Sequence, residues 1–433
     1  MRELGVVEGF RLATVGDCIV SRPLAPLVEV DRGLRRVVGL LRGADVSIGN
    51  LETTVVDVRT AKGSPRTDGD WPLAAGPAVA ADLISLGFRA MGRANNHSMD
   101  WGAEGLRETA RHLDDAGIVH AGADEHLALA RAPRYVETPG GRVALVSTVT
   151  RSVWDQAGAL DPFGAAPGRP GVSALRLKRV ITLPTPAFEA LRELDRTMQP
   201  WTDSTTDTLE IFESRVIEGD EVSVVYEPNP DDLAEILRSL RLAAAHADLV
   251  VLSVHAHEEG ADRDTPPEAL RAFARAAIEA GADLFVGHGV HRLWPIEMHE
   301  DRPILYGLGN FVWSDLTEPL PRALYEYARD LPTGGLSDPW TATDADVTAA
   351  MNEGFLRDEF FQSVVAEVIV RDGAPELSLH PIDLRRDPRL TRRGIPQPAD
   401  PQLAEAILGR LAEISAPFGT KLEATDGVTR VIG

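Results

Sequence analysis

The stretch Ala94–Gly102 reads Ala-Asn-Asn-His-Ser-Met-Asp-Trp-Gly and lies between a short apolar run and a pattern typical of an amphipathic helix. An adjacent asparagine and histidine supply a neutral oxygen ligand and an imidazole, a pair suited to holding a metal ion and to working beside it as acid or base. Alone the pair is a weak signal. It becomes informative through the rest of the chain, where the same arrangement recurs.

Four further polar clusters begin where a β-like apolar run stops. They are Gly16-Asp17-Cys18, Asn50-Leu51-Glu52, His255-Ala256-His257-Glu258-Glu259 and Gly287-His288-Gly289-Val290-His291. Carboxylates and imidazoles that meet at strand ends are how an α/β enzyme builds its active site. For each of these residues the competing interpretation is structural, a carboxylate that caps a turn or a buried histidine, but the repeated placement favours a shared site.

Composition limits the partners that the chain can have. Of the 433 residues, 66 are acidic and 44 are basic, giving a formal net charge of −22, and no run of lysine or arginine breaks that balance. Nucleic acids and anionic membrane surfaces are therefore poor partners. The hydrophobic content of 44% is ample for a buried core. We expect a peptide or small-molecule substrate, and the sequence leaves the oligomeric state open.

The cysteine count and the N-terminal segment bear on the compartment. Cys18 is the single cysteine, which excludes an intrachain disulfide and a cysteine-based zinc site, and we expect it to be a small buried residue. Residues 1–8 carry acidic side chains and no long apolar segment, so they predict neither a signal peptide nor a membrane anchor. We expect a cytoplasmic protein.

Apolar periodicity predicts helices packed outside a pair of mixed sheets. Strands are expected over Phe10–Val15, Val46–Gly49, Arg142–Thr148, Asp248–Val254, Asp283–Gly287, Pro303–Gly309, Gln362–Val370 and Glu376–Leu379. Helices are expected over Ala78–Leu86, Glu104–Ala116, Asp231–Ala245, Pro267–Ala280 and Pro401–Ile414.

Two long segments, 151–220 and 314–358, interrupt this pattern. The first opens with a loop rich in Gly, Pro and Ala and continues with a helix near Ala187–Met198. Long insertions at strand ends are common places for lids and substrate-recognition surfaces, and decoration without a role in binding is an equally good interpretation. We expect one domain over residues 1–433, with both insertions flanking the active-site edge.

The order of the motifs resembles the CapA family, named for poly-γ-glutamate capsule synthesis. The resemblance covers Gly-Asp, Asn-Leu-Glu, Ala-Asn-Asn-His-x-Met-Asp-x-Gly, Gly-His-x-x-His and Pro-Ile-Leu-Tyr-Gly-Leu-Gly-Asn-Phe, and it runs from about Arg11 to Leu422. That family is similar to the calcineurin-like metallophosphoesterases. The resemblance implies an α/β fold, a four-layer α/β/β/α sandwich with its metal or active site at one edge.

The same resemblance implies a role for each motif residue. Asp17 and His291 would hold a first divalent metal, Glu52 would bridge, and Asn96, His255 and His288 would serve a second. His97 and Asp100 would form an acid/base pair beside the cluster, and we place Asp17 and His291 among the catalytic groups as well. We expect one or two divalent metals and no organic cofactor.

The chain also departs from the phosphoesterase pattern. Ile19 stands where a histidine is usual, and the terminal Gly-His-x-His is stretched to His288-x-x-His291. The first metal site is therefore short of a ligand. In an extended strand His257 points to the same side as His255, so it can compensate or contact substrate. Arg93 is a candidate for binding a substrate carboxylate or phosphate, with a structural salt bridge as the alternative.

Three enzymatic functions and one binding function fit these residues. The first is a metal-dependent phosphoesterase or other hydrolase, which the missing ligand weakens. The second is a role in poly-γ-glutamate synthesis, although the chain shows no anchor and its negative charge disfavours a polyanion. The third, which we prefer, is an isomerase. Unanchored CapA-like proteins resemble peptide epimerases of ribosomal peptide pathways, including those of lasso peptides, and inversion at Cα needs two proton-transfer groups. A binding module is less favoured, because so many ionisable groups are costly to bury unused.

Overall fold

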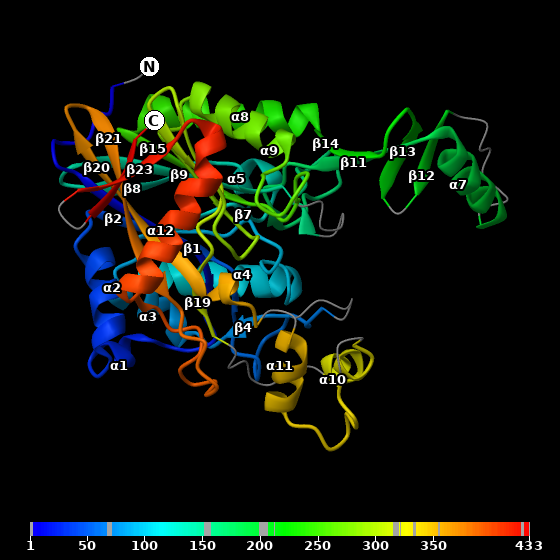
Figure 1. Ribbon diagram of the computed structural model, residues 1–433. Helices are drawn as coiled ribbons and strands as arrows, with labels where there is room; N and C mark the ends of the chain where they lie inside the picture. The colour runs from blue at the N-terminus through cyan, green and yellow to red at the C-terminus, as the bar shows by residue number, and fades with distance from the viewer. Residues whose placement is uncertain are drawn as a thin grey trace.

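The structure is a computed structural model, and it describes residues 3–66, 72–150, 157–198, 207–211, 213–314, 320, 322–331, 335–353, 356–425 and 428–432 (Figure 1). Its largest element is a ten-stranded sheet in the order β23-β24-β21-β20-β1-β2-β5-β6, with β19 beside β1 and β22 beside β21. The strands are β1 (Arg11–Ile19), β2 (Val46–Leu51), β5 (Ala90–Gly92), β6 (Val119–Ala121), β19 (Asn310–Trp313), β20 (Gln362–Arg371), β21 (Ala374–Asp383), β22 (Gln397–Pro398), β23 (Lys421–Thr425) and β24 (Val428–Ile432).

A second sheet has six strands in the order β17-β18-β16-β15-β9-β8. They are β8 (Arg134–Thr138), β9 (Gly141–Val149), β15 (Leu249–His255), β16 (Leu284–His288), β17 (Ile296–His299) and β18 (Arg302–Leu305). The central strands β9, β15, β16 and β18 run parallel. Parallel strands are covered on both faces, which explains why β15 is buried along its whole length and reads as an almost continuous apolar run.

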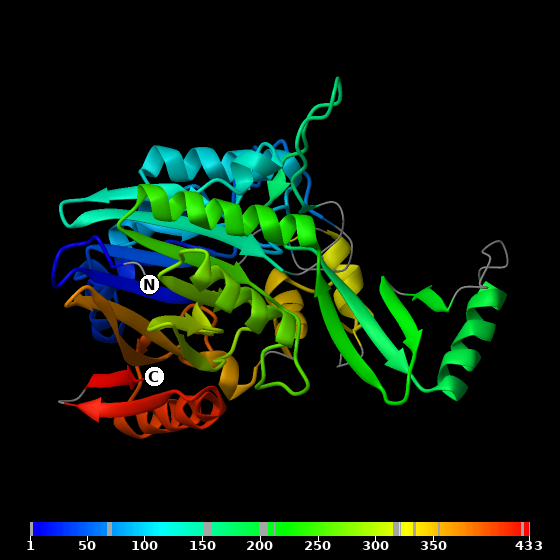
Figure 2. The ribbon, with the colours of Figure 1, turned by 90° about the horizontal axis from the view of Figure 1, so that it is seen from above.

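Helices cover the outer faces of both sheets. Helices α2 (Arg32–Arg42) and α3 (Ala78–Leu86) share an apolar core with the ten-stranded sheet, whereas α8 (Pro230–His246) and α9 (Glu268–Glu279) share one with the six-stranded sheet. A third core, which includes Ile48 and Val251, lies between the sheets. These cores separate four layers, so the predicted α/β/β/α sandwich is confirmed (Figures 1 and 2).

The remaining elements close the edges. They are α1 (Ala25–Val28), α4 (Gly102–Ala116), α5 (Leu127–Ala130), α12 (Pro401–Ser415), the 3-10 helices η2 (Asp358–Phe361) and η3 (Ala416–Phe418), and the short pairs β3 (Thr54–Val55) with β4 (Ala74–Ala75) and β7 (Ala123–Asp124) with β10 (Gly171–Val172). In the described part of the chain, no helix is long and apolar enough to cross a membrane.

One predicted strand is wrong. The apolar run Pro303–Gly309 is not a single strand, because β18 ends at Leu305 and the chain crosses to the other sheet, where β19 begins at Asn310. The crossing brings the Gly309 carbonyl against β1. A Cβ at Gly16 would lie 1.9 Å from that oxygen, so only glycine fits there, and Asp17 N donates to it at 3.0 Å.

Helix α2 is not among the helices that the apolar pattern predicts. Its apolar residues Leu34, Val37, Val38 and Leu41 are buried, but arginines and glycines interrupt the run, and this obscures the helical pattern. The helix start is clear in the structure, where Asp31 at the N-cap accepts from Gly33 N and Leu34 N.

The first insertion forms a projecting sheet, which we call the arm (Figure 2). It consists of β11 (Leu177–Leu183), β12 (Thr208–Ile211), β13 (Ser214–Glu218) and β14 (Ser223–Pro228), in the order β12-β13-β11-β14, with α7 (Thr185–Met198) packed on it. Phe188, Leu209 and Val216 form its own small core. The arm ends at Pro228, past the expected boundary at 220. Residues 151–156, 199–206 and 212 lie outside the described part.

The second insertion contains α10 (Arg322–Arg329) and α11 (Asp344–Asn352). Leu324 on α10 and Val347 on α11 belong to one small apolar core. Residues 315–319, 321, 332–334 and 354–355 of this segment lie outside the described part. That residues 1–433 form a single domain stays a prediction.

Cys18 is fully buried in the middle of the large sheet. It follows Asp17 on β1 and belongs to the core under α2 and α3. Burial, and then the negative charge of Asp17, raises the pKa of its thiol well above the usual range.

Candidate active site

The predicted site residues meet at one edge of the two sheets because neighbouring parallel strands end there. Asp17 lies on β1, Glu52 follows β2, and His255 and His288 are the last residues of β15 and β16. The register of β1 against β2 shifts just before Asp17, and its register against β19 shifts just after it. Such bulges re-aim side chains next to active sites.

Asp17 contacts a histidine and several hydrogen-bond donors. Oδ1 accepts from Asn50 Nδ2 at 2.8 Å, whereas Oδ2 accepts from Gly289 N at 3.0 Å and lies 3.2 Å from His291 Nδ1. Burial opposes its ionisation, but the contact with His291 and the nearby His255 and His288 hold the pKa of Asp17 below its usual range. Asp17 is therefore an ionised carboxylate surrounded by imidazoles.

Glu52 is the opposite case. It is fully buried, and neither carboxylate oxygen has a hydrogen-bond partner among the described residues. Its Oε1 faces three imidazoles, with His255 Nε2 at 3.5 Å and His97 Nε2 and His291 Nε2 at 3.9 Å each. Burial, and then the charge of Asp17, raises the pKa of Glu52 well above its usual range. An orphaned buried carboxylate among imidazoles is the donor set that a divalent metal takes.

Three sets of side chains have ligand atoms within 4.8 Å of one another. They are Asp17 with His255 and His288, Asp17 with Glu52 and His291, and Glu52 with His255 and His257. The residues thus fit a divalent cation, which would supply positive charge beside a substrate oxygen. Each set has three members, so none is marked as incomplete by its size, and His257 enters beside His255, with the two Nε2 atoms 2.8 Å apart.

His97 is oriented by a buried carboxylate. Its Nδ1 lies 2.7 Å from Asp100 Oδ2, which also accepts from Leu73 N at 2.7 Å. Burial raises the pKa of Asp100, an effect that His97 opposes. A carboxylate accepts the proton of Nδ1, so Nε2 of His97 presents its lone pair toward Glu52.

His255 and His288 are buried and uncharged. Burial lowers the pKa of His288 to about 4, and burial together with His257 lowers that of His255 well below its usual range. Their Nδ1 atoms lie 3.0 Å apart, and Ser253 Oγ is 2.7 Å from His288 Nε2. Neutral imidazoles are the form that binds a metal.

Asparagines also organise the site, and of these only Asn96 was assigned a role from the sequence. Asn95 Nδ2 donates to Asn50 Oδ1 at 3.0 Å and to Leu51 O at 2.8 Å, which ties the His97 loop to β2. Asn310, the first residue of β19, contacts His291 Nδ1 through Oδ1 at 2.9 Å. Asn96 Oδ1 is buried without a hydrogen-bond partner in the described chain, so its role as a ligand stays a prediction. Their place in Asn-rich motifs at strand ends was the only available signal.

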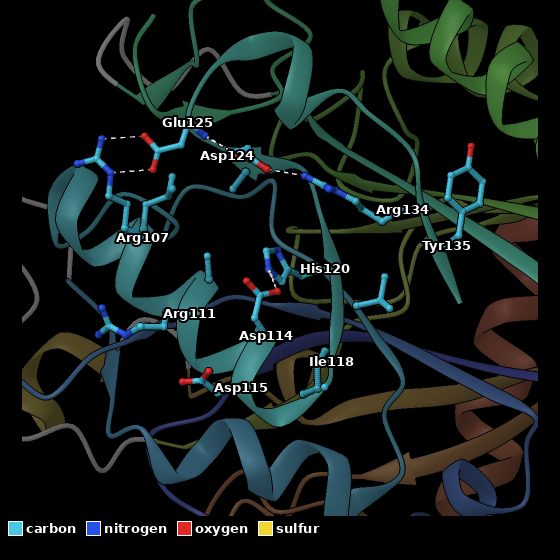
Figure 3. A pocket seen from close by; sticks show the side chains of 15 residues that line it. Arg107, Arg111, Asp114, Asp115, Ile118, His120, Asp124, Glu125, Arg134 and Tyr135 are labelled. Carbon is cyan, nitrogen blue, oxygen red and sulfur yellow. Dashed lines mark hydrogen bonds and ion pairs between the residues drawn. The ribbon is translucent and has the colours of Figure 1, made fainter. Parts of the chain in front are cut away.

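Arg93 does not lie where a substrate-binding residue was expected. Its guanidinium contacts His120 Nδ1 at 3.3 Å and donates to Leu106 O at 2.9 Å, whereas none of its described contacts reaches the histidine cluster. His120 lines a separate pocket over α4 and β6, where its ring faces Asp114 (Figure 3). The alternative role, a structural salt bridge, is not seen among the described residues either. Arg93 is fully buried, and its guanidinium contacts an imidazole and a backbone carbonyl. The alternation of β5 explains this, because the residue after it points away from the cluster.

Comparison with known proteins identifies the family. The family model described as "Bacterial capsule synthesis protein PGA_cap" matches residues 11–315, more than half of the chain. The chain belongs to this family. PGA_cap proteins belong to the metallophosphoesterase-like superfamily, in agreement with the sandwich and with the ligand sets at its edge.

Relatives extend the match beyond the family model. "Uncharacterized protein y4sH" of Sinorhizobium fredii (strain NBRC 101917 / NGR234) is 41% identical and covers 98% of this chain and 93% of the relative. "Capsule biosynthesis protein CapA" of Bacillus anthracis is 26% identical, covering 74% of this PGA_cap chain and 64% of the relative. "PGA biosynthesis protein CapA" of Bacillus subtilis (strain 168) is also 26% identical, with 83% and 77% covered.

Proposed function

We propose that the protein is a peptide epimerase that inverts one Cα centre by proton transfer between two histidines. One observation carries the proposal: His97 and His291 come from different loops, and each places Nε2 3.9 Å from the same atom, Glu52 Oε1. Each ring also has an acceptor at Nδ1, Asp100 for His97 and Asn310 for His291. Two oriented imidazoles that address one small region are the parts a two-base inversion needs.

The steps balance without a redox partner. One Nε2 takes the proton from Cα, and the electron pair of the broken C–H bond moves into an enolate-like intermediate. The other histidine, protonated at Nε2, returns a proton to Cα. Asp100 stabilises the imidazolium of His97, because a carboxylate at Nδ1 favours the charged ring.

The experiment is isotope exchange in heavy water. Test substrates are peptides translated from short reading frames that adjoin the gene, together with an oligo-γ-glutamate, since the names of two relatives refer to capsule or PGA biosynthesis. We expect one residue of a cognate peptide to gain one deuterium at Cα without hydrolysis, measured by mass spectrometry and chiral amino-acid analysis. Asp17→Asn should suppress the gain, and His97→Gln should suppress the inversion of the labelled residue. Hydrolysis of a general phosphate ester with no label in any peptide would reject the proposal.

A second candidate is a metal-dependent phosphoesterase or hydrolase, and the unpartnered Glu52 oxygens specifically favour it. In that function His291 would bind a metal through Nε2 instead of moving a proton. Elemental analysis and a p-nitrophenyl phosphate assay separate the two. Because Ile19 stands where a histidine ligand of the first metal is usual, we expect less than two equivalents of tightly held metal per chain, and two equivalents with efficient phosphate release would favour the hydrolase.

A further inference from the structure

The side-chain amide of Asn310 has only one orientation that satisfies its contacts. Nδ2 lies 3.0 Å from Phe360 O and 3.3 Å from His291 O, and both of these are backbone carbonyls that can only accept. The NH₂ group must therefore face them. Asn310 is fully buried at the start of β19, so solvent does not compete for the amide.

That orientation directs Oδ1 of Asn310 to His291, where it lies 2.9 Å from Nδ1. An amide oxygen accepts but does not donate, so Nδ1 must carry the proton. Asp17 Oδ2, 3.2 Å from the same nitrogen, is also an acceptor. In the neutral ring the lone pair then lies on Nε2, the nitrogen that faces Glu52.

The backbone at His291 makes this support necessary. His291 has φ of +57°, in the left-handed region that non-glycine residues seldom adopt. The bond from Asn310 Nδ2 to His291 O holds the residue in that conformation, while the bond at Nδ1 holds its ring. One asparagine thus fixes both the main chain and the side chain of the same histidine.

Asn310 is also joined to the segment that follows the second insertion. Phe360 lies in η2, and besides its carbonyl its ring lies 6.1 Å from the ring of Trp313, which is 5.2 Å from the His291 ring. The end of the insertion therefore contacts His291 by two routes, through the Asn310 amide and through the Trp313 ring.

We propose that Asn310 is a positioning residue that keeps His291 in the Nδ1–H tautomer, with Nε2 free to accept a proton, and that it connects the segment after the second insertion to this base. Its catalytic consequence rests on the proposed function, but the tautomer itself does not. A residue that orients a histidine through its second nitrogen typically affects activity by 10- to 100-fold.

The test reads the tautomer directly. In protein labelled with ¹⁵N-histidine, long-range ¹H–¹⁵N spectra show which ring nitrogen carries the proton, and His291→Gln assigns the signal. We expect the Nδ1–H form in the wild type and in Asn310→Asp, which keeps an acceptor. Asn310→Leu removes both the acceptor at Nδ1 and the donor to His291 O, so the ring is no longer held beside Asp17, and we expect a mixture of tautomers. An unchanged His291 signal in the leucine variant would overturn the proposal.

Controls separate this inference from the proposed function and from misfolding. Asn229→Asp makes the same amide-to-carboxylate change at the N-cap of α8, and we expect the wild-type His291 signal. If the leucine variant does not fold, Asn310→Ala carries the same expectation. With an active peptide, Asn310→Leu should lower kcat about tenfold with KM unchanged, and Asn310→Asp should recover most of it. A mixed tautomer without peptide epimerisation would retain the inference and reject only the function.

Discussion

The two loops that carry His97 and His291 reach the same result by different means. The loop Arg93–Trp101 is held by side chains: Asn95 Oδ1 accepts from His97 N, Asp100 contacts the His97 ring, and Thr54 Oγ1 donates to His97 O at 2.8 Å. The loop Gly289–Arg292 has an unusual main chain, with φ of +106° at Gly289 and +57° at His291, and side chains from outside the loop, Asp17 and Asn310, hold it. An oriented imidazole can thus be built from a polar network, which a sequence displays, or from a strained main chain, which it conceals.

The strongest way to break this comparison is to remove each imidazole in turn. If both histidines move protons, His97→Gln and His291→Gln should each lower net epimerisation by about 10³-fold. The two variants should differ in exchange, because the remaining base still removes the Cα proton from one epimer. We therefore expect deuterium wash-in from the L peptide in one variant and from the D peptide in the other.

The control for this experiment is His112→Gln, a partly exposed histidine on α4 that contacts Glu108. It should exchange both epimers like the wild type. If His97→Gln and His291→Gln lost exchange with the same epimer, the histidines would not act from two sides, and the two-base mechanism would be wrong.

The next largest effect concerns Asp100, the carboxylate within the first loop that contacts His97 Nδ1. Asp100→Asn replaces the acceptor at His97 Nδ1 with an amide that can turn its NH₂ group to the ring, which favours the other tautomer. We expect kcat to fall about 100-fold. Asp114→Asn removes the carboxylate from the His120 pair at 3.3 Å, outside the cluster, and should leave kcat unchanged. If Asp100→Asn and Asp114→Asn had the same kcat, the carboxylate of Asp100 would be dispensable.

Gly289 in the second loop and Gly102, the residue that follows the first loop, offer a comparison of stability. A Cβ at Gly289 would lie 2.6 Å from Ala256 O, and its φ of +106° is unfavourable for any side chain, whereas Gly102, with φ of +65°, has nothing within 4 Å. We expect Gly289→Ala to lower the free energy of unfolding by about 3 kcal/mol and Gly102→Ala by about 1 kcal/mol. Urea denaturation measures both free energies. If the two variants lost similar amounts of stability, the close packing and φ at Gly289 would not constrain the second loop.

The smallest predicted effect concerns His120, which contacts the guanidinium of Arg93 at the start of the first loop. Burial, and then the charge of Arg93, lowers the pKa of His120 from 6.5 to about 3. Below pH 6.5 the unfolded chain takes up this proton and the folded chain does not, so stability falls as the pH decreases toward 3. Relative to His120→Gln, the wild type should lose about 2 kcal/mol of unfolding free energy between pH 7 and pH 5. If the unfolding free energies of the wild type and His120→Gln changed in parallel with pH, the lowered pKa of His120 would be contradicted.

The parts of the molecule that follow from local pattern were predictable from the sequence. The helix Ala78–Leu86 was predicted with its observed bounds, and strands were predicted where β20 and β21 lie, because apolar periodicity acts over a few positions. Asp17, Glu52, His255, His288 and His291 were expected at strand ends, and the structure brings them together there.

What could not be predicted depends on contacts between distant segments. The crossing after Leu305 depends on the fit of Gly16 against Gly309, nearly three hundred residues away in the chain. The direction of Arg93 depends on His120, and the role of Asn310 depends on the Phe360 carbonyl. No periodicity within either segment encodes these partners. The sheet of the arm could not be predicted for the same reason, since β11 pairs with strands that come after an intervening helix.

The burial of Cys18 gives the protein a built-in reporter of opening. It is the single cysteine in the chain, and it lies on β1, which pairs with β2, β19 and β20. A thiol reagent attacks the thiolate, which neither burial nor the raised pKa allows in the closed sheet. The rate of alkylation, followed as one mass increment on the intact chain, therefore measures how often the strand that carries Asp17 separates from its neighbours. A ligand that binds at the strand ends should slow that reaction without touching the sulfur.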